Sequence, residues 1–112
     1  MDQAVVILSN AGSAEEAERI AGALVRECMA SCVNIVPRIR SVYRWQGEIE
    51  WADEWMMVIK TMRSCARTTM RRLVELHSYE VPEAIILPIE DGHAPYLEWI
   101  DANVESTWHD IK

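Results

Sequence analysis

The chain has 112 residues, half of them hydrophobic and 26% charged, so we expect one soluble globular domain spanning residues 1–112. The net charge of −7 argues against nucleic acid or an anionic membrane as a partner, because both repel an acidic surface. The sequence has no hydrophobic run that approaches the ~20 residues of a membrane span, and it has no basic leader. Its number of cysteines is odd. We therefore expect a cytoplasmic protein with reduced thiols.

The first thirty residues predict a buried strand followed by an amphipathic helix. Residues 4–8 are all hydrophobic, which is typical of a strand buried on both faces. Ser13 and Glu16 have the spacing of a capping box, in which the serine hydroxyl accepts from the Glu16 amide while the glutamate side chain reaches back. Hydrophobic residues at helical spacing then indicate a helix that ends near Ala30.

Residues 32–61 predict a long β-hairpin. Apolar and polar residues alternate along 32–45 and again along 49–61, and Gly47 marks the reversal between them. Matching opposite charges across the two strands places Arg44 against Glu50 and Arg40 against Glu54. This register also sets three apolar pairs opposite each other and leaves the three-residue loop 46–48. The pairs are Trp45 with Ile49, Tyr43 with Trp51, and Ile39 with Trp55.

The predicted hairpin is long for a domain of this size. A strand over residues 32–45 spans about 46 Å at ~3.3 Å per residue, even before any kink at Pro37. A compact chain of this length has a radius of gyration of only about 13 Å. A projecting tip would expose an aromatic patch, which soluble monomers avoid, so we expect the hairpin to pack on another subunit. The alternative is that its strands curl over their own core. The residues assigned to this hairpin contact are Tyr43, Trp45, Gly47, Trp51 and Trp55.

The second half of the chain predicts a helix, a strand and a final helix. Helical spacing runs from Arg63 to Leu76, Pro82 ends any helix before it, and residues 84–89 read as a strand covered on both faces. Pro95 suits the first turn of the last helix. The order strand, helix, strand, strand, helix, strand, helix predicts an α+β, ferredoxin-like fold (βαββαβ plus a C-terminal helix). Its antiparallel sheet carries the long hairpin between the second and third strands.

The junction between the second helix and the last strand holds the best candidate metal ligands. His77 offers an imidazole and Glu80 a carboxylate, and copper or zinc suits this pair better than magnesium. Two ligands are too few for a closed site, so we expect weak binding completed by water or a neighbouring subunit. The alternative is that His77 is a helix-end histidine bonded to the backbone.

A second interpretation of the junction is a polar cleft for a small molecule. Lys60 ends the returning strand of the hairpin and is expected to face Tyr79 and Glu83, with the cleft lying between subunits if they meet there. Glu80 and Glu83 could form an acid and base pair, although carboxylates at a turn are usually just solvated. The sequence has no nucleophile elbow, phosphate-binding glycine loop or HExxH helix. We therefore expect neither an enzyme nor an organic cofactor.

Several motifs, taken together and in order, give the chain a resemblance to a known family. The segment His77-Ser78-Tyr79-Glu80-Val81-Pro82-Glu83 resembles the motif His-Pro-Tyr-Glu-x-Pro-Glu of the CutA family of divalent-cation tolerance proteins, with serine in place of proline. Further matches span almost the whole chain. They are Cys32-Val33-Asn34-Ile35-Val36-Pro37, Ser41-x-Tyr43-x-Trp45-x-Gly47, Lys60-Thr61 and Tyr96-Leu97-x-Trp99-Ile100.

The resemblance implies the same fold, a homotrimer assembled around the long hairpins, and a role in the response to metal ions and in tolerance of divalent cations such as copper. Some members carry a cysteine and a second histidine where this chain has Ser9 and Leu76, so those soft copper ligands are missing here. The alternative is a trimeric sensor of small molecules with clefts between subunits, as in ferredoxin-like nitrogen-regulatory signal proteins. That alternative depends on fold analogy alone.

Overall fold

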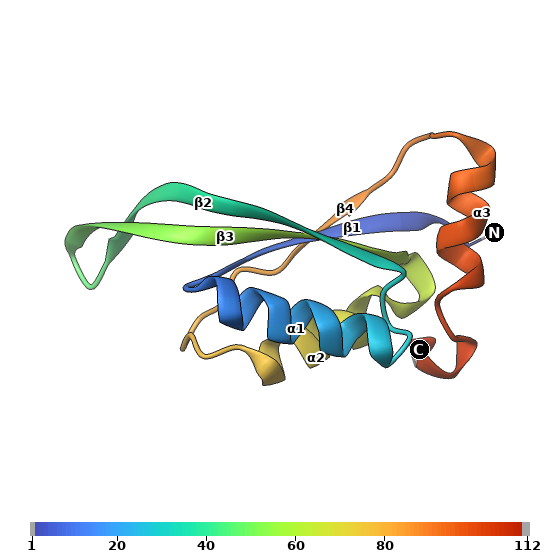
Figure 1. The fold of residues 1–112 in the computed structure, drawn as a ribbon, viewed down its shortest axis with the longest axis horizontal. Coiled ribbons are helices and arrows are strands. Elements are labelled where there is room, and N and C mark those ends of the chain that lie inside the picture. The colour runs from blue at the N-terminus through green and yellow to red at the C-terminus, as the bar shows by residue number, and fades with distance from the viewer. Residues whose placement is uncertain (1, 111–112) are drawn as a thin grey trace.

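The computed structural model of the chain describes residues 2–110, which form a four-stranded antiparallel sheet with three α-helices (Figure 1). The strand order in the sheet is β2-β3-β1-β4, and the predicted α+β order of elements is confirmed. Short 3-10 turns follow β3 and α3. The elements are β1 (Ala4–Ala11), α1 (Ala14–Arg26), β2 (Cys32–Trp45), β3 (Glu48–Met62), α2 (Ala66–Leu76), β4 (Ile85–Pro88) and α3 (Ala94–Ala102).

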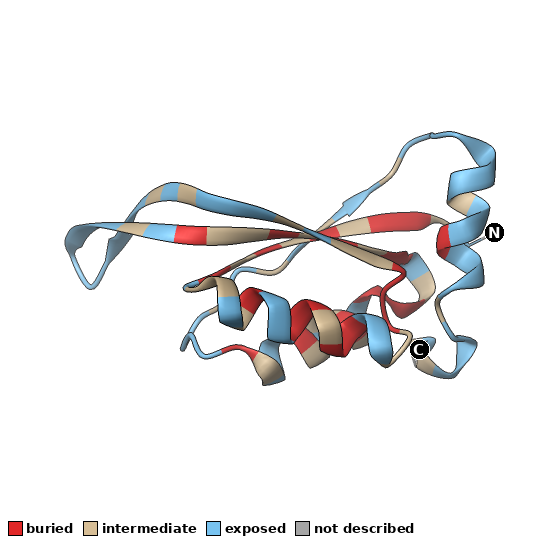
Figure 2. Cartoon of the chain, in the orientation of Figure 1, coloured by how far each residue is buried: buried red, intermediate tan, exposed pale blue. Residues whose placement is uncertain are grey.

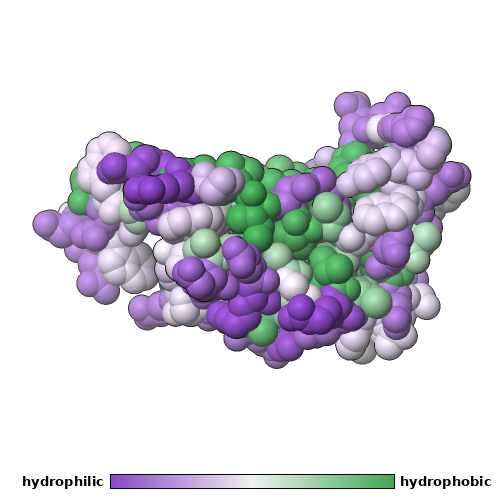
Figure 3. All heavy atoms as spheres, in the orientation of Figure 1, coloured by the Kyte–Doolittle hydropathy of each residue, from purple (hydrophilic) through white to green (hydrophobic). Residues whose placement is uncertain are grey.

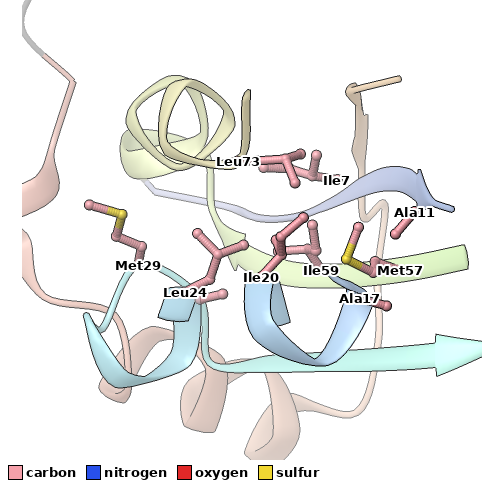
Figure 4. Close-up of a cluster of buried hydrophobic side chains, with 10 residues drawn as sticks. Ile7, Ala11, Ala17, Ile20, Leu24, Met29, Met57, Ile59 and Leu73 are labelled. Carbon is pink, nitrogen blue, oxygen red and sulfur yellow. The ribbon is translucent and has the colours of Figure 1, made fainter. Parts of the chain in front are cut away.

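The main core lies between one face of the sheet and the helices α1 and α2 (Figures 1 and 2). The Ser13 hydroxyl caps α1 by accepting a 3.1 Å hydrogen bond from the Glu16 amide, as predicted. The helix then buries one apolar stripe against the strands (Figure 4). The core side chains include Ile7, Ala17, Ile20, Leu24, Met57, Ile59 and Leu73.

The opposite face of the sheet has no described helix over its middle (Figure 1). Val6 and Leu8 of β1 are half-buried there and pair directly with Leu87 and Ile85 of β4, which are 42% and 47% exposed. The expectation that residues 84–89 are covered on both faces is therefore wrong for a single chain. An antiparallel sheet can leave one face in water, but that face is then normally polar. Around Val6, Leu8, Ile85 and Leu87, this face is apolar in the single chain.

The hairpin of β2 and β3 projects beyond the rest of the molecule, as expected (Figure 1). The molecule measures 44 × 28 × 24 Å. A β-bulge between Val36 and Ile39, with Arg38 at φ 61°, bends β2 next to Pro37.

The predicted hairpin register is wrong by one residue. Trp45 pairs with Glu48 and Tyr43 with Glu50, so aromatic rings lie opposite carboxylates. The cause is the turn: Gln46 and Gly47 both have positive φ, 50° and 83°, which is the two-residue geometry that matches strand twist. The turn sets the register, and the predicted charge pairs do not form.

The turn predicts a specific effect of substituting Gly47. Gly47→Val places a β-branched residue at φ 83°, which is strained although no atom lies within 4 Å of the new Cβ. We expect faster amide hydrogen exchange along the tip of the hairpin. Gly47→Asn is the control, because asparagine tolerates this conformation far better. Equal exchange in the wild type and Gly47→Val would contradict the turn assignment.

Candidate functional site

The junction begins with a histidine whose ring is enclosed by the protein. His77 follows α2 in extended conformation, and its side chain is fully buried. Its Nε2 lies 2.6 Å from the carbonyl oxygen of Asn10, and its Nδ1 accepts a 3.1 Å hydrogen bond from the Tyr79 amide. Because a carbonyl oxygen can only accept, Nε2 carries the proton and the Nδ1 lone pair is already used. The alternative interpretation, a helix-end histidine bonded to the backbone, describes this geometry.

A glutamate on α1 connects that helix to the junction. The Glu16 carboxylate accepts a 2.8 Å hydrogen bond from the Ser78 amide and lies 3.8 Å from His77 Nδ1. The Glu16 carboxylate also reaches back toward the start of α1, where the Gly12 backbone contributes a hydrogen bond to it. Burial alone would raise the pKa of Glu16, but the hydrogen bonds from Ser78, with a smaller effect of His77, outweigh it and hold the pKa below its usual range.

Tyr79 joins the junction to the base of the hairpin. Its hydroxyl donates a 2.8 Å hydrogen bond to Glu54 Oε2, and its ring packs 4.7 Å from the His77 ring. A Cβ at Gly12 would meet the tyrosine hydroxyl at 3.0 Å, so the absence of a side chain at Gly12 makes room for Tyr79. Partial burial first, and then the Glu54 carboxylate, raise the pKa of Tyr79. The phenol therefore stays a hydrogen-bond donor at neutral pH.

A pocket of about 320 Å³ opens beside Tyr79, where β1 ends and the hairpin starts to project. Three aromatic rings and three carboxylates line it, and none of its described lining residues is basic. Asn10 donates a 3.3 Å hydrogen bond to Glu83, while its own Oδ1 is buried and has no hydrogen-bond partner among residues 2–110. The lining residues are Asn10, Tyr43, Trp45, Glu54, Tyr79, Glu80, Val81 and Glu83.

The structure brings together most of the predicted cleft residues. Tyr79 and Glu83 line the pocket with Glu80, but Lys60 does not. Lys60 pairs with Val6 and bonds to Asn34, roughly 17 Å along β1 from its end at Ala11. The prediction of Lys60 in this cleft is therefore wrong within one chain. The prediction fails because β3 runs antiparallel to β1. The end of β3, which carries Lys60, therefore lies beside the start of β1 and away from the pocket.

The predicted metal ligands His77 and Glu80 are close in sequence but differ in environment. Glu80 is exposed at the pocket, whereas His77 is buried with both nitrogens hydrogen-bonded. Within residues 2–110, no group of three or more His, Cys, Asp or Glu side chains is arranged to hold a metal ion. A metal could reach Nδ1 only by displacing the Tyr79 amide. The metal role of this pair stays a prediction, and it requires local rearrangement.

The hairpin residues expected to form one aromatic patch are divided among three environments. Tyr43 and Trp45 line the pocket, whereas Trp51 lies on the other face, 64% exposed, with Arg40 5.5 Å from its ring. Trp55 packs half-buried against the core. Sequence reasoning also missed Glu54 and Glu16 as site residues. Their partners are far away in the sequence, and no local signal marks them.

The chain is similar to known proteins over most of its length. The sequence profile of the CutA1 divalent ion tolerance proteins matches residues 5–103. The chain belongs to the CutA1 family. It is 44% identical over 98 residues to the divalent-cation tolerance protein CutA of Thermus thermophilus, covering 88% of this chain and 95% of that protein. It is also 43% identical over 90 residues to human Protein CutA, where the match covers 80% of this chain and about half, 50%, of the human protein.

Solved CutA structures have the same fold. The Cut A1 protein of Thermus thermophilus superposes with a TM-score of 0.87 at 42% identity, over 94% of this chain and 100% of that one. CutA of Xylella fastidiosa gives a TM-score of 0.90 at 37% identity, and the match covers 92% of this chain and 99% of that one. CutA of Archaeoglobus fulgidus, described as periplasmic, gives 0.88 at 41% identity, over 91% and 99%. Within residues 2–110 of this CutA1 chain, each helix is too short or too polar to cross a membrane.

The contact between Glu16 and Ser78 predicts a pH-dependent loss of stability. Because the pKa of Glu16 is lowered in the folded state, its contribution is present above the unfolded pKa near ~4.5 and is lost as the pH falls through the folded pKa. We expect Glu16→Gln to lower the free energy of unfolding by roughly 1 kcal/mol at pH 7 and by progressively less below pH ~4.5. Denaturant unfolding across this range is the measurement.

The matched control is Glu15→Gln on the same turn of α1, an exposed residue. It shares the interaction of Glu16 with the helix dipole, so the difference between the two variants reports the contacts that Glu16 alone makes, which are the Ser78 bond and a 3.7 Å ion pair with Arg19. Equal destabilisation by both substitutions at pH 7 would show that the Ser78 bond contributes nothing.

Proposed function

We propose that this CutA1 family member acts as a homotrimer with a ferredoxin-like sheet and contributes, without catalysing a reaction, to tolerance of divalent cations, copper foremost. The observation that carries the trimer is the uncovered apolar face of the sheet. Figure 3, in a view with α1 in front, shows hydrophobic surface between the hairpin and α3. Family membership supports the role in cation tolerance.

The uncovered face continues across the sheet. Met56 and Val58 of β3 are half-buried and pair with Asn10 and Leu8 of β1, so they extend the apolar surface from β4 toward β2. Monomeric proteins rarely leave such a surface in water. The sheet also ends in two unpaired strands, β2 and β4. Packing three copies together would cover the apolar face and could pair these edges, which supports a closed assembly.

The trimer predicts that a charge on this face separates the subunits. Leu87→Glu, at a side chain 42% exposed on the uncovered face, should convert the trimer to monomers in sedimentation equilibrium at micromolar concentration. The reason is that a carboxylate buried without a partner is strongly unfavourable. Val74→Glu is the control, because Val74 is 44% exposed but lies on α2.

The Val74→Glu variant should remain trimeric. Circular dichroism checks that both variants keep their secondary structure. A wild-type protein that sediments as a folded monomer would refute the trimer.

The metal part of the proposal is a weak, open site at the junction that uses His77 and Glu80. Binding to Nδ1 has to break the hydrogen bond from the Tyr79 amide, which lowers the affinity. Two protein ligands leave most of the coordination shell to water or to a neighbouring subunit. Such a site suits a response to raised metal concentration better than permanent storage of a metal.

This site predicts a defined order of affinities. In calorimetric titrations at neutral pH, Cu(II) and Zn(II) should bind weakly and Mg(II) still more weakly, because imidazole suits the first two ions. His77→Ala should remove most of the Cu(II) heat. The control is His93→Ala, at an exposed histidine before α3. Identical Cu(II) isotherms for the wild type and His77→Ala would exclude His77 as a ligand.

A second candidate function is the sensing of a small molecule. The pocket beside Tyr79 favours it, because a volume of about 320 Å³ lies within the range of ligand sites, roughly 300–1,000 Å³. In this candidate, cation tolerance follows indirectly from regulation. A ligand response that requires Tyr79 and persists when divalent metal is removed by a chelator would distinguish it from direct metal binding.

A further inference from the structure

We infer that the pocket beside Tyr79 binds a small organic cation of the alkylammonium class. This inference rests on the small-molecule candidate above, since it gives the ligand class of the same pocket. It shares Glu80 with the proposed metal site but does not use the buried imidazole of His77 as a ligand.

The first argument is a buried carboxylate without a counter-charge. Glu54 is only 7% exposed and lines the pocket, yet no described lysine, arginine or histidine nitrogen lies within 4 Å of it. The Tyr79 hydroxyl is its one hydrogen-bond donor in the described part of the chain. Acidic side chains this deeply buried are normally paired with a cation. The pocket therefore lacks a positive group.

Other polar groups of the pocket also favour a positively charged ligand. The buried Oδ1 of Asn10 is an acceptor for which the described part of the chain supplies no donor, and the amide nitrogen of Asn10 orients Glu83 through the 3.3 Å hydrogen bond. Glu80 adds a third carboxylate to the lining. Every unused polar group named here attracts positive charge, so an anionic ligand is disfavoured.

The aromatic rings decide which kind of cation fits. Tyr43, Trp45 and Tyr79 all line the pocket, and ring faces attract ammonium and especially quaternary ammonium groups. Carboxylates are the ligands that magnesium and calcium prefer, but within residues 2–110 no three acidic, histidine or cysteine side chains are arranged to hold a metal ion. Tyr79 is held in place from two sides, by the His77 ring and by Glu54. The wall it forms is thus preorganised, which favours binding.

Arginines of the same hairpin do not fill the pocket. Arg40 lies 3.4 Å from Asp53 and 5.5 Å from the Trp51 ring, on the face of the hairpin away from Trp45. Arg44 alternates with Trp45 and so belongs to that same face. An arginine reaching in from a second copy of the chain is the other possible source of positive charge, and the experiment separates it from a free ligand.

The test is a titration of choline into the full-length protein, in which binding is measured by calorimetry and by tryptophan fluorescence. Its control ligand is 3,3-dimethylbutan-1-ol, which has the shape of choline without the charge. We expect saturable binding of choline at millimolar concentration and none of the alcohol. Glu54→Gln should weaken choline binding about tenfold while still offering Tyr79 an acceptor. Asp53→Asn, at the neighbouring carboxylate on the other face, should leave binding unchanged, and melting curves check that both variants fold.

Three results would overturn the inference. Equal binding of choline and the neutral alcohol would remove the cation preference and leave the small-molecule candidate standing. Choline binding that appears only in Arg40→Gln or Arg44→Gln would show that a second copy supplies the cation. Absence of choline binding in the wild type and in all these variants would show that the pocket takes no organic cation.

Discussion

The buried imidazole of His77 is the contact on which the site depends. One nitrogen holds the backbone at the end of β1, and the other holds the amide that begins the loop after α2. These two bonds fix the ring of Tyr79 beside Gly12, and the tyrosine in turn reaches Glu54 at the base of the hairpin. His77 thus connects the end of α2 to β1 and, through Tyr79, to the β2–β3 hairpin. The pocket follows from this connection, because its walls come from all of these neighbours.

The sheet uses its two faces for different purposes. The helices α1 and α2 bury one face in an ordinary core, and the other keeps an apolar surface that a single chain leaves uncovered. A small domain of this size gains limited stability from one core, so a second buried face would add a large share of the total. The same assembly would bring further copies close to the hairpins and the pocket. Association and ligand binding are then expected to influence each other.

The parts of the fold that depend on local patterns could be predicted, and those that depend on distant contacts could not. The cap at Ser13 and the helix after it follow from spacing within one turn. The hairpin follows from alternation, but its register depends on the φ angles at Gln46 and Gly47, which charge matching does not reveal. The position of Lys60 within one chain depends on the direction of β3 relative to β1, which alternation along a single strand does not encode. The burial of Glu54 depends on a tyrosine 25 residues away, so nothing local identifies it.

Ser78 is where the junction of this chain departs from its family motif. Where the family usually has proline, Ser78 supplies a backbone N–H, and that N–H is the donor to Glu16. Proline has no such hydrogen, so the link between α1 and the junction is impossible in a chain that keeps the usual residue. Such a chain gains a stiffer backbone in the unfolded state instead. In this chain, the serine thus replaces the stiffness of a proline ring with a hydrogen bond that ties the junction to α1.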